Sequence, residues 1–185
     1  MPNIDNKRPL QTATATHWRR CRVGLLLCAC SIPAAGAVTP AQPASKWQIS
    51  PAPPGDDSLS LSLKAEKEVK GWMKSAVPTL TVQCGKKKAA VYVETWLPLE
   101  VTQVDKQIVR IQLDNGRPIP QRWQEITNAS MGASARDSML LVRQFTQSKK
   151  FVLEFTPFNS PPVRAEFDVT GLEALMPQLT RTCWE

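Results

Sequence analysis

Histidine is nearly absent from this sequence: its 185 residues include one, His17. That residue lies in an N-terminal stretch that we expect to be removed on export, which would leave the mature protein without any histidine. Such a protein cannot build a Ser-His or Cys-His dyad, nor a zinc site with histidine ligands. The sequence also lacks internal repeats and any apolar run long enough to span a bilayer. We therefore expect a protein that is not an enzyme, with no catalytic residues, no cofactor and no metal.

The first 37 residues have the order of a secretory signal peptide. A basic segment at 18–22 precedes an apolar core at 23–30, and residues 35–37, Ala-Gly-Ala, offer small side chains where signal peptidase cuts. This order predicts cleavage after Ala37 and a periplasmic protein. The polar run before the basic segment is long for a signal peptide, so a later start codon stays open.

Two other interpretations of this stretch stay open. The apolar core could be a buried segment of the fold. Residues 27–30, Leu-Cys-Ala-Cys, also loosely fit a lipobox, in which Cys30 would become the lipidated first residue of an anchored lipoprotein. The small residues at 35–37 fit ordinary cleavage better, so the lipoprotein is the alternative.

Removing the leader changes what the charge implies. The leader holds five of the 23 Lys/Arg residues and one of the 16 Asp/Glu residues, so the mature chain has a net charge of +3. The pI of about 9.4 belongs largely to the leader and is no argument for nucleic acid. We expect no nucleic-acid partner.

Two cysteines remain in the mature chain, Cys84 and Cys183. An exported protein with two cysteines most simply pairs them, and two separate thiols are the alternative. The bridge would close a loop of roughly 100 residues, which the chain-entropy account values at about 4–5 kcal/mol. It would also fix the C-terminal segment, which carries Trp184, to the rest of the protein.

The pattern after residue 37 predicts one mainly β domain. Residues 38–55 are rich in Pro and Ala and are expected to form a linker, followed by a single domain at 56–185. Alternating apolar residues predict strands, with 121–126 a short strand at best. The expected strands are 57–64, 79–84, 89–96, 106–113, 149–158 and 161–170.

Two segments have helical rather than alternating spacing. Residues 135–147 fit a helix with Asp137 as its N-cap, and 172–183 fit a C-terminal helix that Pro177 should bend or shorten. The apolar stripe of this second helix consists of Leu172, Leu175, Met176 and Leu179. The fold class that follows is an antiparallel β-sandwich or curved sheet with a mid-chain helix and a C-terminal helix, which cover an edge or an end of the sheet. The bridge is expected to hold the last helix against a sheet edge that would otherwise be open.

The candidate site residues are few. Asp56-Asp57 is the sharpest acidic pair and could help to bind a cation, but a turn that opens the first strand explains it better. Lys86-Lys87-Lys88 could contact an anionic polymer or lipid, or could be a solvated hairpin tip. Trp123, beside Arg122, could stack on a sugar, although the tryptophans that follow the leader (Trp47, Trp72, Trp96, Trp123 and Trp184) suit core and edge positions too.

Five pieces of sequence, in order, carry a family resemblance that covers residues 46–184. They are KWQIS, GDDSLSLSL, PTLTVQC, VRIQLDNGRPIPQRW and FDVTGLEALMPQLTRTCWE. Together they resemble the VasI/TagO-like family of periplasmic accessory proteins associated with bacterial type VI secretion. The resemblance implies a protein partner among secretion-apparatus components of the cell envelope. It also makes Asp56, Asp57, Asp114 and Trp123 the family-motif candidates for binding.

The chain departs from this family at two positions where an arginine is expected. Gln83 precedes Cys84, the first cysteine after the leader, and Gln112 lies two residues before Asp114. A charged contact between neighbouring strands would be lost with these arginines. The residues also allow a second function: a free-standing periplasmic binding module of the peptidoglycan-binding or inhibitor type. This alternative is based on Trp123 and on the three lysines Lys86-Lys87-Lys88.

Overall fold

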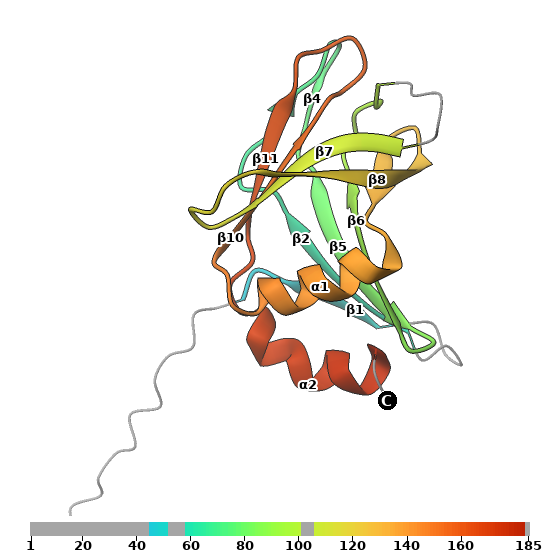
Figure 1. Cartoon of the computed structure of the whole chain (residues 1–185), viewed down its shortest axis with the longest axis vertical. Helices are drawn as coiled ribbons and strands as arrows, with labels where there is room; N and C mark the ends of the chain where they lie inside the picture. Colours follow the sequence, from blue (N-terminus) through green and yellow to red (C-terminus); the bar gives the residue numbers. More distant parts are fainter. Residues whose placement is uncertain (1–44, 52–57, 101–105, 184–185) are drawn as a thin grey trace, which may run out of the picture. The chain divides into compact units, whose positions relative to one another are not determined.

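The computed structural model describes residues 45–51, 58–100 and 106–183. These residues form a mainly β domain with eleven strands and two helices (Figure 1). The predicted fold class is confirmed: the sheet is antiparallel, the two helices lie mid-chain and at the C-terminal end, and one disulfide is present. The predicted signal peptide, Cys30, Asp56, Asp57 and Trp184 lie outside the described residues.

Within the described ranges, nine strands form one antiparallel sheet. They are β1 (Gln48–Pro51), β2 (Leu59–Lys64), β5 (Thr79–Gly85), β6 (Lys88–Glu94), β7 (Lys106–Leu113), β8 (Ile119–Thr127), β9 (Ser130–Gly132), β10 (Lys150–Phe155) and β11 (Val163–Asp168). Their order across the sheet is β1-β2-β5-β6-β9-β8-β7-β10-β11. The remaining two strands, β3 (Val69–Lys70) and β4 (Ser75–Ala76), pair only with each other.

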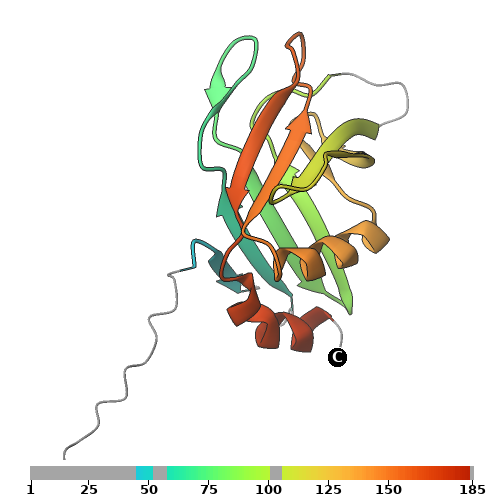
Figure 2. The same ribbon diagram turned by 60° about the vertical axis from the view of Figure 1, so that its left-hand side comes forward.

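The sheet curves until its two halves face each other across an apolar core. Figures 1 and 2 show β10 and β11 lying over β2 and β5 rather than beside them. The backbone N–H of Glu66, just after β2, donates to the carbonyl of Glu166 on β11 at 2.8 Å, which joins the halves. Because side chains alternate along a strand, each half turns one apolar face inward. The inward face includes Leu61, Leu63, Leu80, Val82, Leu153, Phe155 and Phe167, all buried.

Helix α1 (Ala135–Phe145) lies beside β6, and one of its side chains accepts a hydrogen bond from the backbone of that strand. The hydroxyl of Ser138, which is fully buried, accepts the backbone N–H of Val91 at 3.0 Å. The prediction that Asp137 is the N-cap is wrong, because Ser134 holds that position. The Ser134 hydroxyl accepts the N–H of Asp137 at 3.2 Å and donates to its carboxylate at 2.7 Å. This reciprocal arrangement resembles a capping box.

Helix α2 (Leu172–Cys183) is tied to β5 by the predicted disulfide between Cys84 and Cys183, which is confirmed. The helix continues through Pro177 rather than ending there. Its predicted apolar stripe faces the core: Leu172 and Leu179 are buried, and Leu175 and Met176 pack partly buried against the same core.

The position of α2 corrects one expectation. The edge strands of the sheet are β1 and β11, whereas Cys84 belongs to β5, an interior strand. Figure 2 shows α2 below the lower ends of the strands. The helix therefore closes an end of the curved sheet instead of covering an open edge. Without the helix, the apolar interior between the two halves would be exposed at this end.

The ordered domain begins earlier than the predicted boundary at residue 56. Residues 48–51 form β1, which pairs with β2, although they lie inside the segment expected to be a linker. Trp47 is buried, and its indole N–H donates to the carbonyl of Val169 at 3.3 Å. Lys46 pairs with Asp168 at 2.8 Å. Composition rich in Pro and Ala did not reveal these contacts, because they are made with the distant end of the chain.

Gly171 explains how the chain turns from β11 into α2. Its φ of +84° lies in the left-handed region, and a Cβ there would approach that of Ser45 to 2.8 Å. Only glycine meets both requirements without strain.

Strand β8 is longer than predicted. It spans nine residues, but most of its side chains are exposed or half-buried and only Trp123 is buried. A strand with a single buried residue shows no apolar alternation, which is why the pattern indicated a short strand. Among the described residues, no helix is long and apolar enough to cross a membrane.

Candidate functional site

An exposed apolar surface lies at the end of the domain away from the two helices. The β3–β4 hairpin is closed by a hydrogen bond from the Gly71 N–H to the Lys74 carbonyl at 2.9 Å, so Trp72 and Met73 form its tip. The side chain of Leu97 lies against the base of the hairpin, since a Cβ on Gly71 would approach it to 3.1 Å. The tip is therefore supported from below, while 61% of Trp72 and 84% of Met73 remain exposed.

The loop between β10 and β11 brings a third apolar residue to the same place. Phe158 is anchored through its backbone N–H, which donates to the Pro98 carbonyl at 2.8 Å, and 43% of the residue is exposed. The rings of Trp72 and Phe158 meet edge to face, with 6.3 Å between their centroids. In Figure 1 the hairpin of β4 and the β10–β11 loop lie together at the upper end. We call Trp72, Met73 and Phe158 the apolar tip.

The composition of the apolar tip is that of a binding surface. Large aromatic side chains and methionine are enriched where proteins contact one another, and monomeric proteins rarely gather them in the open. Lys70 and Lys74 flank Trp72 and Met73 along the hairpin. An apolar centre with a basic rim suits an apolar partner surface with an acidic border.

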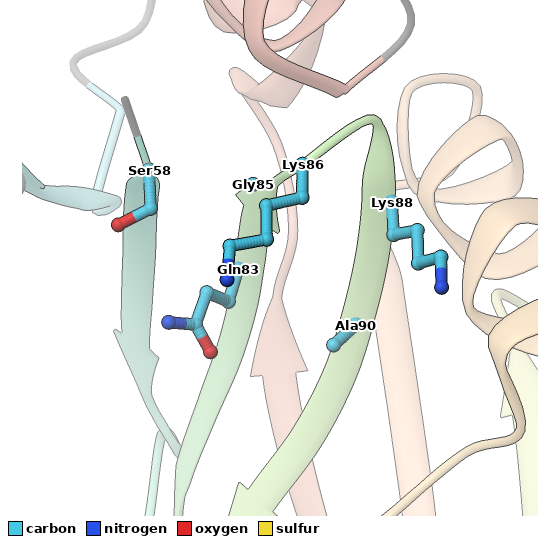
Figure 3. A pocket seen from close by; sticks show the side chains of 6 residues that line it. All are labelled: Ser58, Gln83, Gly85, Lys86, Lys88 and Ala90. Atoms are coloured by element: carbon cyan, nitrogen blue, oxygen red, sulfur yellow. The ribbon is translucent and has the colours of Figure 1, made fainter. Parts of the chain in front are cut away.

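A second feature, the lysine turn, lies at the hairpin between β5 and β6. Gly85 pairs with Lys88, so Lys86 and Lys87 are the two residues of the loop, and both have positive φ, 50° and 59°. An open pocket of about 250 Å³ lies beside it, lined by Ser58, Gln83, Gly85, Lys86, Lys88 and Ala90. Figure 3 shows the Lys86 side chain lying over Gln83, with Ser58, the residue before β2, across from them.

The predicted binding candidate Trp123 is fully buried, with 0% exposure. Its indole N–H donates to the side-chain oxygen of Gln121 at 2.9 Å. A buried ring has no open face for a sugar, so Trp123 serves the core. Among the tryptophans that the structure describes, Trp72 is exposed in the apolar tip, and Trp96 is also exposed, with its indole N–H donating to the Thr79 hydroxyl at 3.3 Å.

The predicted candidate Asp114 has a structural role. It follows β7 in a left-handed conformation, with φ of 47°, and its carboxylate accepts the backbone N–H groups of Lys149 and Lys150 at 2.8 and 2.9 Å. These two hydrogen bonds lower the pKa of Asp114 from its ordinary value of 3.8, because they favour the charged form. The bond from Lys150 has the larger effect. The residue holds the start of β10 against the end of β7.

Replacing Asp114 by alanine is expected to lower the free energy of unfolding by about 1 kcal/mol, the usual size for a side chain that accepts backbone N–H groups. Asp114→Asn should cost less, because asparagine keeps an acceptor oxygen and tolerates positive φ. The charged form is favoured in the folded state, so its contribution is full above pH 3.8 and disappears as the pH falls through the lower folded-state pKa. Urea unfolding from pH 7 to 3 should show wild type and Asp114→Asn converging in acid; a constant difference would contradict this role.

The two glutamines that replace expected arginines lie in different places. Gln83 lines the pocket beside the lysine turn. Gln112 accepts a hydrogen bond from the Arg164 guanidinium at 2.8 Å and donates to the Asp114 carbonyl at 3.3 Å. An arginine at position 112 would face Arg164, so glutamine suits this neighbour better.

The apolar tip was missed by sequence reasoning. The signal was a pair of large apolar residues between lysines in Lys70–Lys74, at a break in the strand pattern. That signal does not indicate that Phe158 would join them, because the contact depends on the curvature of the sheet. No family model, curated protein or solved structure matches this chain.

Proposed function

We propose that this chain is an exported accessory protein that acts by docking on a protein partner in the cell envelope, with the apolar tip as its contact surface. The observation that carries the proposal is the edge-to-face pair of Trp72 and Phe158, exposed together with Met73 on a supported hairpin. Buried clusters of such residues supply most of the binding energy at protein interfaces. The disulfide suits an oxidising compartment.

The resemblance to VasI/TagO-like proteins supports the context: the partner belongs to a type VI secretion apparatus. The basic residues beside the tip, Lys70 and Lys74, favour a partner whose contact surface has an acidic border. The protein acts by contact rather than by catalysis, in keeping with a mature chain without histidine.

Replacing the tip residues Trp72 and Met73 together by serine is expected to abolish function without unfolding the protein. Loss of two anchor residues should weaken partner binding at least about tenfold. Their exposure means that stability should change by less than about 0.5 kcal/mol. In a strain that encodes the chain, the readout is release of the type VI tube protein into the medium, after deletion of the gene and complementation with each variant.

The matched control replaces two exposed apolar residues outside the tip, Ile108 and Leu140, by serine. This control should restore secretion, whereas the tip variant should not. Full secretion by the deletion strain would refute the secretion role, and full complementation by the tip variant would refute the contact surface. Tip-dependent sedimentation with lipid vesicles but with no protein partner would show instead that the tip inserts into a membrane.

A further inference from the structure

The lysine turn has an unfavourable local conformation for its sequence. A two-residue hairpin loop with positive φ at both residues is the kind that Asn-Gly or Asp-Gly forms, because these residues tolerate the left-handed region. Here both positions are lysine, at φ of 50° and 59°. A residue with a Cβ costs roughly 1–2 kcal/mol in this region. Backbone strain of this kind points to a role for the side chains that cause it.

Of the two strained loop residues, one lies over a pocket. Lys86 lines the pocket and lies over Gln83, whereas Lys87, the other loop residue, does not line it (Figure 3). The lining thus combines the side chains of two lysines, Lys86 and Lys88, with a side-chain amide that can donate and the hydroxyl of Ser58. This combination suits a small oxyanion such as a carboxylate.

The surface next to the pocket is polar, and charged residues, Lys64 and Glu94, follow where the same face reaches the other end of the strands. Along the outer face, Ser60 lies opposite Gln83, and Ser62 and Tyr92 lie on either side of Thr81, which is itself buried. Side chains of this kind exchange hydrogen bonds with a polar polymer. An exposed cluster of aromatic and other apolar residues, of the kind that inserts into a lipid surface, lies at the opposite end of the domain in the apolar tip, whereas single apolar residues such as Ile49 are exposed elsewhere.

We propose that the lysine turn is a binding site for carboxylate groups on a polar envelope polymer, namely the peptide-bearing glycan of the cell wall. Lys86 pairs with the carboxylate, Gln83 donates to it, and the polymer continues over the hydroxyl-rich face of β2, β5 and β6. The site is separate from the apolar tip and shares with the proposed function only the location in the envelope.

The test is sedimentation of the purified mature protein with isolated peptidoglycan sacculi. Wild type should be depleted from solution, and sacculi whose carboxylates have been converted to amides should deplete it at least about tenfold less, since the ion pair is lost. Lys86→Asn should lose binding to a similar extent. Lys87→Gly should keep binding and raise the urea midpoint, because glycine relieves the strain without touching the pocket.

Lys67→Asn is the matched control, since it removes the same charge from an exposed position in the segment between β2 and β3. It should bind as wild type does. Equal losses in Lys67→Asn and Lys86→Asn would mean attraction by net charge alone and would overturn the site. Wild type that stays in solution would also overturn it, as would unchanged binding by Lys86→Asn. Depletion by vesicles containing phosphatidylglycerol, but not by sacculi, would reassign the site to phosphate headgroups.

Discussion

Replacing Cys183 by serine is expected to lower the free energy of unfolding by about 2–5 kcal/mol, the usual cost of losing a native bridge in a small exported domain. Cys84 and Cys183 are 99 positions apart in sequence, and both are fully buried. The bond therefore constrains most of the domain in the unfolded state. In the folded state it holds α2 against the end of the sheet.

Truncation after Gly171 should cost more than the loss of the bond alone. It removes the bridge together with Leu172 and Leu179, which are fully buried, and each buried leucine contributes about 1.5–3 kcal/mol. The truncated protein would also expose the apolar interior at the end that α2 closes. We expect the truncated chain to yield little folded protein.

Urea unfolding of the two single cysteine variants and of the double variant provides the control. Either substitution removes the same bond. The free energy of unfolding of the double variant, Cys84→Ala with Cys183→Ala, should therefore be close to that of the less stable single variant. Additive losses would show that the two thiols act separately. Alkylation of both cysteines in folded wild type, found by mass mapping without reduction, would refute the tether outright.

The parts of the fold that the sequence predicts are those with local patterns. Leu59, Leu61 and Leu63 alternate with serines, and the structure pairs them with β5 in register. The cysteine pair follows from the number of cysteines outside the expected leader, two. The C-terminal helix follows from the spacing of Leu172, Leu175, Met176 and Leu179, and all four contact the core.

The parts that could not be predicted depend on contacts between distant segments. Trp47 packs near Val169, so the predicted linker is partly ordered. Trp72 and Phe158 meet because β10 and β11 lie over the first half of the sheet. The same limit applies to Trp123: its neighbours in sequence, such as Arg122 and Gln124, are exposed, and only the tertiary fold shows which face of β8 is buried.

Replacing Trp123 by alanine is expected to destabilise the domain by about 3–5 kcal/mol, because a fully buried tryptophan leaves a large cavity when it is truncated. The lost ring also leaves the Gln121 side chain without its 2.9 Å hydrogen bond from the indole. A loss of this size is comparable with the whole stability of many small domains. Trp123→Phe should cost less, since it retains most of the apolar volume.

Trp72→Ala is the matched control for Trp123→Ala, because it removes the same side chain from an exposed position. Its free energy of unfolding should change by less than about 0.5 kcal/mol. Urea unfolding and sacculus binding, measured on the same preparations, distinguish a core role from a sugar-stacking role. Trp123→Ala that unfolds at the wild-type midpoint while losing sacculus binding would restore Trp123 as a binding residue, and it would contradict the burial of the ring.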